Sequence, residues 1–309
     1  MINNRLYYVH CMSSVHIGTG QGVGIIDMPM IREKVTEWPY LPGSSMKGVH
    51  RVFFKSGIHK QPQKWLDSAF GKPSNKGIDF NSDDGIELDD GKAGALVMSD
   101  AKILAFPVAS RYGTFAYVTC PLVLKRFRRD TVAAGVDMPE FDWAALESVV
   151  NSGVVMLHTD SKLDKNNEVF VDEFTSGAVK DEAFAKWTDW LAGQIFVKDD
   201  LSETMLKERM LLVSDEAFQY FVSMCSEVVP RIRIGLETGS VEPGALWNEE
   251  YLPVESILYG VIWSDGISVK TLENRGLLDI FPEEAFLQIG GNATVGKGRI
   301  RCRYVKGGA

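Results

Sequence analysis

Cysteine is scarce in this sequence, which has only Cys11, Cys120, Cys225 and Cys302 among 309 residues. No two of them have the CxxC spacing of a metal or redox site, so the sequence excludes a cysteine zinc site and a disulfide framework. We expect four reduced side chains that act as small buried hydrophobes.

Long apolar runs are also lacking. The best candidate, residues 103–124, is broken by Pro107, Arg111 and several hydroxyl side chains, whereas a membrane helix needs about 18 uncharged apolar residues. The opening MINNRLYYVHCMSS has no basic stretch followed by an apolar core, which argues against a signal peptide. We therefore expect a soluble, cytoplasmic protein.

Charge is distributed unevenly along a chain whose formal net charge is −8. Three blocks are basic: residues 31–64 (net +5), 101–129 (+6) and 290–309 (+5). Residues 137–216 (−11) and 217–289 (−7) are acidic. If the basic blocks converge in the fold, they form a phosphate-binding surface despite the acidic total; the alternative is ordinary clustering on a solvated surface.

The composition, 45% hydrophobic and 24% charged, is typical of a globular chain and excludes a disordered one. Alternation and capping signals predict strands and helices throughout, with no internal repeat and no dividing linker. We expect strands over 5–17, 231–237, 245–264 and 298–305, and helices from residue 46 and over 139–150, 181–196 and 214–229. The expected fold is one α+β domain over 1–309, with terminal strands in one sheet and insertions at 71–94 and 137–213.

Two glycine-rich stretches imitate nucleotide-binding motifs and fail in detail. GTGQGVG at 18–24 has Val23 where a dinucleotide fingerprint needs its third glycine. GNATVGKG at 291–298 matches seven positions of a P-loop, but Gly298 replaces the Ser or Thr that holds magnesium, and a strand follows instead of a helix. We reject NTP hydrolysis. A glycine loop carrying Lys297 could still present backbone N–H groups to a polyphosphate.

Four candidate polar residues each have an ordinary structural explanation when taken alone. Asp27 lies near a proline, as turn aspartates often do, and His16 fits a strand. Glu249 and Glu250 could be one inward and one outward carboxylate of a single strand.

Six segments, taken in order, carry a resemblance that no single motif carries: SSVHIGTGQGVGIIDMPMIRE, LPGSSMKGVHR, GALVMSDAKILAFPV, YVTCPLVLKRF, LWNEEYLP and QIGGNATVGKGR. Together they resemble the repeated backbone subunit of type III-B CRISPR (Cmr) effector complexes, the fourth subunit type of these complexes and a member of the RAMP superfamily. The likeness runs from residue 5 to 305 and is weakest across 130–230.

This resemblance implies an RRM-like, ferredoxin-type palm with an inserted helical segment and a β-hairpin thumb, for which 160–175 is the candidate. It implies a catalytic role for Asp27, which would also hold a divalent metal (Mg²⁺ or Mn²⁺) loosely, and places His16, Glu249 and Tyr251 near the cleavage centre. The residues implied to bind guide RNA are Ser44, Ser45, Lys47, Arg51, Gly290, Gly291 and Lys297.

The function implied is binding of guide RNA (crRNA) and endoribonuclease cleavage of complementary target RNA. The implied partners are both RNAs, copies of the chain stacked head-to-tail, and other Cmr subunits. The alternative is a structural RNA-binding subunit of the same kind of complex without nuclease activity.

Overall fold

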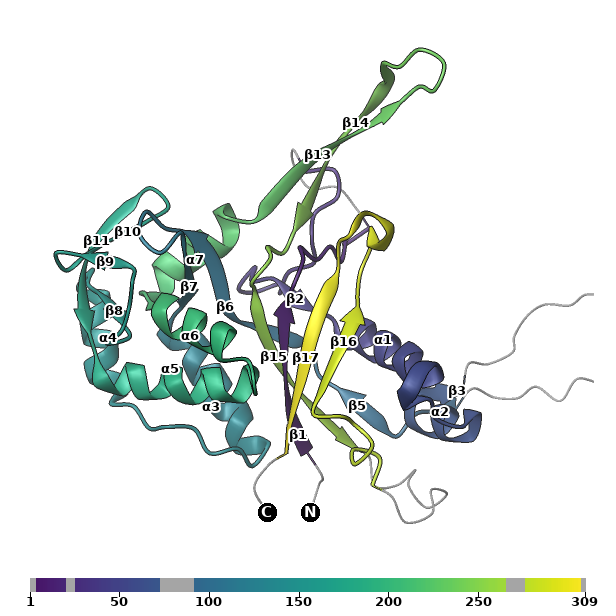
Figure 1. Ribbon diagram of the computed structural model, residues 1–309, viewed down its shortest axis with the longest axis horizontal. Helices are drawn as coiled ribbons and strands as arrows, with labels where there is room; N and C mark the ends of the chain where they lie inside the picture. Colours follow the sequence, from purple (N-terminus) through teal and green to yellow (C-terminus); the bar gives the residue numbers. More distant parts are fainter. Residues whose placement is uncertain (1–3, 21–25, 73–91, 265–275, 307–309) are drawn as a thin grey trace, which may run out of the picture.

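A computed structural model of the chain describes residues 4–20, 26–72, 92–264 and 276–306. Within these ranges one large mixed sheet runs through the molecule (Figure 1). Its order is β16-β17-β1-β15-β6-β7-β12-β8-β11-β10-β9, with β2 beside β6 and β5 beside β15. The strands are β1 (Asn4–Cys11), β2 (Tyr40–Leu41), β5 (Leu96–Met98), β6 (Ala101–Ala109), β7 (Phe115–Thr119), β8 (Val155–Leu157), β9 (Asp164–Lys165), β10 (Glu168–Val171), β11 (Phe174–Lys180), β12 (Met210–Leu212), β15 (Ile257–Ser264), β16 (Glu284–Gln288) and β17 (Arg299–Lys306).

Helices flank this sheet, and two small strand pairs lie outside it. The helices are α1 (Gly43–Lys55), α2 (Gln63–Phe70), α3 (Pro121–Ala133), α4 (Trp143–Asn151), α5 (Glu182–Ile195), α6 (Asp200–Arg209) and α7 (Asp215–Met224), with short 3₁₀ turns at Gly57–His59 and Ala293–Val295. The strand pairs are β3 (Gly71–Lys72) with β4 (Lys92–Ala93), and β13 (Glu227–Ile234) with β14 (Val241–Tyr251). In the described part of the chain no helix is long and apolar enough to cross a bilayer.

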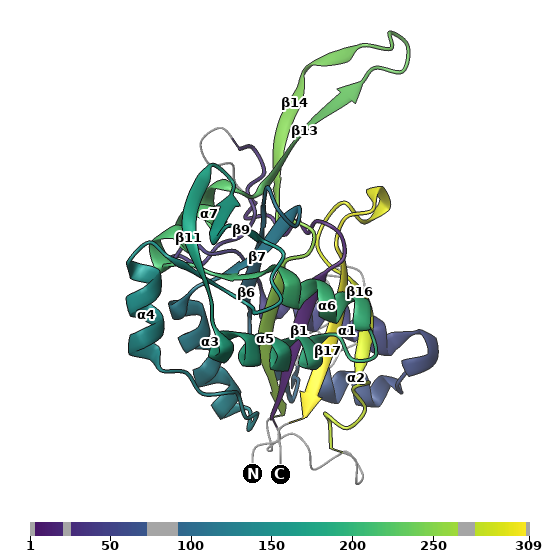
Figure 2. The same cartoon turned by 60° about the vertical axis from the view of Figure 1, so that its left-hand side comes forward.

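Strand β1 lies in the middle of the core because helices cover both faces of the sheet (Figure 2). On one face Tyr8 packs against Phe127 of α3. On the other face His50 of α1 hydrogen-bonds Tyr304 of β17, the residue that pairs with Tyr7. A strand buried on both faces needs apolar residues at nearly every position, which RLYYVHC provides.

The expectation that the terminal strands belong to one sheet is confirmed, and β1 and β17 are in fact antiparallel neighbours. The other neighbour of β1, β15, is antiparallel too. The expected α+β class is confirmed as one large mixed sheet flanked by helices. The strand expected over 5–17 ends at Cys11, because the following residues pack against other segments as irregular chain.

The helix starts expected at residues 181 and 214 are confirmed. Helix α5 follows Asp181, and α7 follows Ser214, whose Oγ accepts the N–H of Ala217. Helix α7 ends at Met224 rather than 229, because the chain then turns into β13. The hydrophobic pattern of the sequence did not predict α2 or α6. In α6 only Leu206 is buried, so this helix has no apolar stripe that a sequence pattern could reveal.

The segment 137–213, expected as an insertion, extends the main sheet: β12 pairs in parallel with β7 and carries β8 to β11 beyond it. The hairpin expected at 160–175 is real. Asn166 and Asn167 both have positive φ, as a two-residue hairpin turn requires, and join β9 to β10. This hairpin is integrated into the sheet edge. For the segment expected over 71–94, residues 73–91 lie outside the described residues.

A different hairpin projects from the molecule. Strands β13 and β14 pair over most of their length and extend well beyond the sheet (Figures 1 and 2). The strands expected over 231–237 and 245–264 are therefore the outer part of β13, and β14 followed by β15. An element that wedges into a duplex must project; the hairpin at 160–175 lies in the sheet edge, whereas β13–β14 projects (Figure 1).

The four cysteines are unpaired, as expected, and three of them are buried. Burial raises the pKa of Cys302 to about 12 and leaves its thiol protonated at neutral pH.

Buried His50 should make stability depend on pH. Burial lowers its pKa from 6.5 to about 4, so the folded protein holds it neutral while the unfolded chain takes up a proton below pH 6.5. This part of the stability is present above pH 6.5 and is lost as the pH falls toward 4. Between pH 7 and pH 5 we expect a loss of about 2 kcal/mol, measured by urea unfolding. In His50→Gln this pH-dependent part should vanish; an unchanged pH dependence would contradict the assignment.

Candidate functional site

The base of the β13–β14 hairpin brings together four chain segments that are far apart in the sequence. Residues 14–18 and 26–32 lie on it from the N-terminal half, and the loop 290–298 lies on it from the C-terminal end. Most of the candidate residues meet here: Asp27, His16, Glu249, Tyr251, Gly290, Gly291 and Lys297.

Asp27 is exposed and fixed to the hairpin through its backbone neighbours. Met28 donates its N–H to the Asn248 carbonyl (3.1 Å) and accepts the N–H of Glu250 (3.0 Å), so this segment runs along β14 like a short added strand. Oδ2 of Asp27 accepts the N–H of Asn248 at 2.7 Å. The residue is exposed, so a ligand can reach its carboxylate.

His16 is buried behind this strand. Its Nδ1 donates to the carbonyl oxygen of Glu250 (2.7 Å), which fixes Nε2 as the acceptor when the ring is neutral. The ring lies 5.4 Å from that of Tyr251, centroid to centroid. A side chain on Gly18 would come within 2.9 Å of Nε2, so glycine there allows the chain to pass close to the imidazole.

Glu249 and Glu250 are both buried, each 4% exposed, which corrects the expectation of one inward and one outward carboxylate. The reason is that both faces of the base of β14 are covered. On one face Glu249 accepts hydrogen bonds from Trp247 (2.9 Å), Asn292 (3.0 Å) and Tyr251. On the other face Glu250 meets the segment that carries Asp27.

The protonation states of the Glu249 face follow from these contacts. Burial acts to raise the pKa of Glu249, but the hydrogen bonds from Tyr251 and Trp247 and the charge of Arg231 outweigh it and lower the pKa below its ordinary value. Burial and the neighbouring carboxylate raise the pKa of Tyr251 to about 12. At neutral pH the pair is a carboxylate that accepts a hydrogen bond from a phenol.

The glycine loop 290–298 packs against the residues around His16. Gly290 has φ +76°, and a Cβ there would lie 2.2 Å from the His16 carbonyl oxygen. Gly291 donates its N–H to that same oxygen (2.9 Å), and Gly298 donates to the Ser14 carbonyl (2.8 Å). These two N–H groups are therefore engaged within the protein and are not free for a phosphate.

Lys297 also has partners inside the protein. Its Nζ lies 2.9 Å from Oε1 of Glu227, the first residue of β13, and 4.5 Å from the ring centroid of Tyr251. The lysine thus joins the glycine loop to both strands of the hairpin.

A second group of candidates lies on α1, and no described contact joins it to the first. The N–H of Gly43 donates to Asp100 (2.7 Å), so Asp100 caps the helix start rather than Ser44 or Ser45. Lys47 is half-buried and forms no ion pair with a described residue; burial and the nearby charge of Arg51 lower its pKa.

Arg51 lies on the same side of α1 as Lys47 and borders the same shallow pocket. Its guanidinium donates to the Gly71 carbonyl (2.6 Å) and lies 3.3 Å from Asp67. Arg51 thus orders the start of the 71–94 segment beside Lys47.

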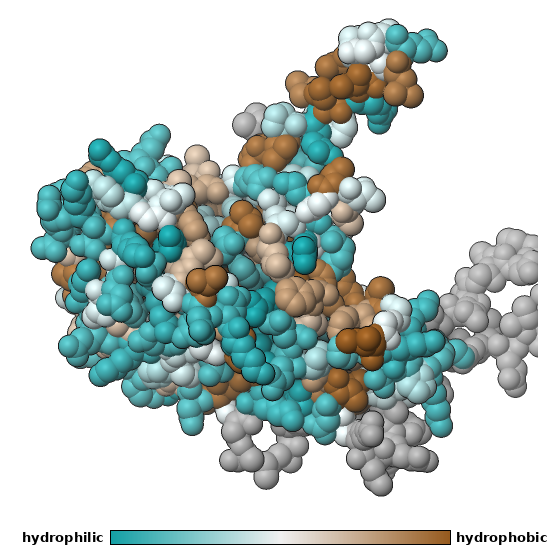
Figure 3. All heavy atoms as spheres, in the orientation of Figure 1, coloured by the Kyte–Doolittle hydropathy of each residue, from teal (hydrophilic) through white to brown (hydrophobic). Residues whose placement is uncertain are grey.

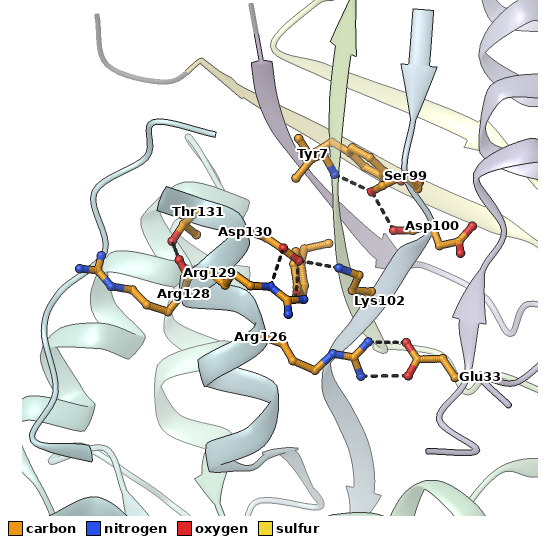
Figure 4. Close-up of polar contacts among 12 residues, drawn as sticks. Tyr7, Glu33, Ser99, Asp100, Lys102, Arg126, Arg128, Arg129, Asp130 and Thr131 are labelled. Atoms are coloured by element: carbon orange, nitrogen blue, oxygen red, sulfur yellow. Dashed lines mark hydrogen bonds and ion pairs between the residues drawn. The ribbon is translucent and has the colours of Figure 1, made fainter. Parts of the chain in front are cut away.

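Most cations of the other basic blocks are neutralised by acidic residues. Arg126 holds Glu33 with two hydrogen bonds (2.9 and 2.5 Å), and Lys102 lies 2.6 Å from Asp130 (Figure 4). In the tail, Arg301 pairs with Asp199 and Glu284. The three basic blocks therefore do not form one surface of unpaired positive charge. Their composition alone overestimates the positive charge that is free to bind phosphate.

The hairpin itself presents two different faces. Arg231 lies opposite Trp247, with Arg233 farther along the same face. The other face is apolar near the tip, where hydrophobic side chains are visible in Figure 3. Its exposed aliphatic residues are Ile232, Ile234, Val241 and Leu246, with Leu236 at the turn.

Several residues of this site were not identified from the sequence: Ser14, Arg32, Glu227, Trp247 and Asn292. Asn292 adopts a left-handed conformation between glycines and donates to both Glu249 and Tyr251. Its place inside a glycine-rich motif was the only available signal, because its partners are more than forty residues away.

Known proteins resemble this chain over almost its whole length. The family model of the RAMP superfamily matches residues 8–301. The chain is 33% identical to the CRISPR system Cmr endoribonuclease Cmr4 of Pyrococcus furiosus over 303 residues, 95% of this chain and 92% of that protein. It is 21% identical to the CMR subunit Cmr4 of Saccharolobus solfataricus over 97% of this chain and 96% of that protein.

Solved structures show the same fold. A crystal structure of oligomeric Cmr4 from Pyrococcus furiosus superposes with a TM-score of 0.67 at 25% identity, covering 99% of this chain and 98% of that one. A chain of a type III-B Cmr-beta complex bound to cognate target RNA superposes with a TM-score of 0.66 at 18% identity, covering 97% and 96%.

Two adjacent glycines offer a matched test of the loop packing. Gly290→Ala should destabilise the protein by about 2 kcal/mol or more, because the new Cβ meets the His16 carbonyl in a left-handed conformation. Gly291→Ala should cost little, since its Cβ would lie 3.7 Å from the nearest atom, in ordinary contact. Urea unfolding measures the free energy of unfolding of both variants. Equal values would show that residue 290 is not packed closely against His16.

Proposed function

The chain belongs to the RAMP superfamily and, within it, to the Cmr4 subunits of type III-B CRISPR complexes, and on this premise we propose that it binds guide RNA and cleaves complementary target RNA. Its activity is that of an endoribonuclease and its role is that of the repeated backbone subunit. The observation that supports the proposal is the exposed carboxylate of Asp27. It lies at the base of a projecting hairpin, where it accepts the backbone N–H of Asn248 at 2.7 Å.

Cleavage at this site needs little chemical machinery. The 2′-hydroxyl of RNA can attack its own adjacent phosphate once the two are held in line, so the protein mainly has to align the strand. An aspartate carboxylate is a weak general base for an RNA hydroxyl. We therefore assign it to alignment, with one oxygen fixed by Asn248 and the other directed to the RNA or to a cation.

A divalent cation, Mg²⁺ or Mn²⁺, fits the donor set of Asp27 only as a loosely held ion. In the described part of the chain no cluster of three or more His, Cys, Asp and Glu side chains could bind a metal. Phosphate oxygens and water would complete the shell around Asp27, and the ion would neutralise charge on the phosphate.

His16, Glu249 and Tyr251 belong to the same centre as groups that fix its geometry. All three are buried in the structure and are saturated with contacts to one another, to Asn292 and to the strand beside Asp27. They hold the glycine loop, the hairpin base and the Asp27 segment in one arrangement.

Guide RNA would be held by its backbone, since a subunit that accepts any guide must not read bases. Lys47 is the best-placed cation, because no described acid neutralises it and the start of α1, with Ser44 and Ser45, lies one turn away. A helix N-terminus and hydroxyl groups favour phosphate. Arg51 supports this surface. Gly290, Gly291 and Lys297 lie at the hairpin base, where the Gly291 N–H and the Lys297 ammonium already have partners within the protein, so they contribute to guide binding only if these contacts are exchanged.

The β13–β14 hairpin is the thumb in this proposal. A projecting two-stranded element can enter a guide–target duplex and displace a nucleotide, which frees the backbone beside it for in-line attack. The arginine and tryptophan face suits phosphates and bases. Copies of the chain stack head-to-tail along the guide in a heterologous contact, together with other Cmr subunits.

The second candidate function is a structural RNA-binding subunit without nuclease activity. The burial of His16, Glu249 and Tyr251 favours it, because these groups do not reach solvent in this structure. Asp27, which does reach solvent, favours the nuclease.

Asp27→Asn separates the two functions. In the assembled complex we expect target cleavage to slow by at least about 100-fold, since the substitution removes the charge that aligns phosphate or cation while preserving shape. Guide retention should not change. Asp160→Asn, at an exposed aspartate elsewhere, serves as the control. Cleavage at the unaltered rate in Asp27→Asn would support the structural alternative.

Salt dependence of guide binding tests the phosphate contacts. Lys47→Ala should lower the slope of log K against log salt by about 0.7, the value for one phosphate on a single strand. Lys297→Ala should change the slope less, because its charge already pairs with Glu227. Lys186→Ala, at an exposed lysine on α5, is the control. Equal slope changes for Lys47 and Lys297 would show that Lys297 exchanges Glu227 for phosphate.

A further inference from the structure

We propose that Glu250, paired with Arg32, is a positioning residue for cleavage. It attaches the Asp27 segment to the hairpin, so the position of the Asp27 carboxylate depends on the position of the hairpin. This inference rests on the proposed function. It concerns a buried side chain that cannot itself touch RNA, since only 4% of Glu250 is exposed.

The Glu250 carboxylate accepts hydrogen bonds from three donors that belong to two different parts of the chain. Oε2 accepts the backbone N–H of Met30 at 3.0 Å. Oε1 accepts from Nη2 of Arg32 at 2.6 Å and from Oγ of Ser226 at 2.7 Å. A buried carboxylate that accepts hydrogen bonds at both oxygens holds its neighbours in one geometry.

Two of these donors lie just after Asp27 in the chain. The backbone ladder of Met28 fixes the segment at one point, and the Met30 and Arg32 contacts fix it from behind. Without the Glu250 carboxylate the segment would keep the ladder, the Asn248 contact and its backbone pairing with residues 17–19, but it would lose its side-chain attachment to the base of the hairpin. The position of the Asp27 oxygens would then be less well defined.

The third donor connects the same carboxylate to the hairpin. Ser226 immediately precedes β13, and Glu250 itself lies in β14, so this one group touches both strands at the hinge of the hairpin. Arg32 adds a further bond, from Nη1 to the Val222 carbonyl at the end of α7 (3.0 Å). A displacement of the hairpin therefore reaches the Asp27 segment through Glu250.

The consequence is kinetic. Misplacement of an aligning group by about 1 Å slows a reaction by about 100-fold even when binding is intact. We expect Glu250→Gln, which keeps the size but removes the charge, to reduce the single-turnover rate of target cleavage 10- to 100-fold. Affinity for guide and target RNA should stay within about twofold, because the groups that contact RNA are unchanged.

The experiment uses the assembled complex with guide RNA and cognate target. The variants are Glu250→Gln, Arg32→Gln and the double variant, each measured for cleavage rate, target affinity and the pH dependence of the rate. If the pair acts as one device, the double variant should be no slower than the worse single variant. The pH profile should keep its shape, because Glu250 moves no proton. Hydrogen exchange at residues 28–32 should rise in each variant.

Asp130→Asn is the matched control, since it removes an ion pair of the same 2.6 Å length away from the hairpin, between Lys102 and Asp130 (Figure 4). It should leave the cleavage rate unchanged. If Glu250→Gln assembles and cleaves at the full rate, or if Asp130→Asn slows cleavage equally, the positioning role is refuted. If Glu250→Gln fails to assemble, Arg32→Lys, which keeps the charge and shortens the reach, decides by the same readouts.

Asp27→Asn in parallel separates the two levels of the argument. Loss of cleavage in Asp27→Asn with full activity in Glu250→Gln refutes only the positioning role. Full activity in Asp27→Asn refutes the proposed function itself.

Discussion

An isolated two-stranded hairpin is marginally stable in water, and this constraint governs the structure around β13–β14. The projecting part has no core of its own, so its base must be held firmly from both sides. The glycine loop with Lys297 and Asn292 holds one face, and the segment from Met28 to Arg32 holds the other. Both adjacent glutamates of β14 are buried as a result. The candidate active site is thus also the foundation of the hairpin.

Charge compensation follows from the same arrangement. Buried acids at the hairpin base require cations, and Arg32, Arg231 and Lys297 serve them. A basic residue that neutralises a buried carboxylate is not available to RNA unless that carboxylate is released. Binding of a polyanion by an acidic chain then depends on a few uncompensated positions, of which Lys47 at the start of α1 is the clearest.

The sequence was informative where physical signals are local. Proline at the start of α3, Ser214 before α7, the Asn-Asn turn and the arginine alternation in β17 all determine structure through neighbouring residues. The ordered motifs of the family resemblance grouped Asp27, His16, Glu249 and Tyr251, and the structure brings these four residues to the base of one hairpin. What could not be seen was pairing across the chain: 218 residues separate Arg32 from Glu250, and no local pattern reports their contact.

The difference between the two hairpins has the same origin. The turn within 160–175 is visible in neighbouring residues, whereas the strands expected over 231–237 and 245–264 carry no local sign that they form a projecting hairpin. A hairpin packs into a sheet only if a neighbouring strand pairs with its edge. Strand β11 pairs with β8, whereas among the strands of the described residues β13 and β14 pair only with each other. The free hairpin then recruits the segment before Arg32 as a partial third strand, and that segment carries Asp27. On the proposed function, one small sheet therefore contains both the element that opens a duplex and the carboxylate that aligns the opened backbone. Each copy of the subunit supplies both at a fixed separation.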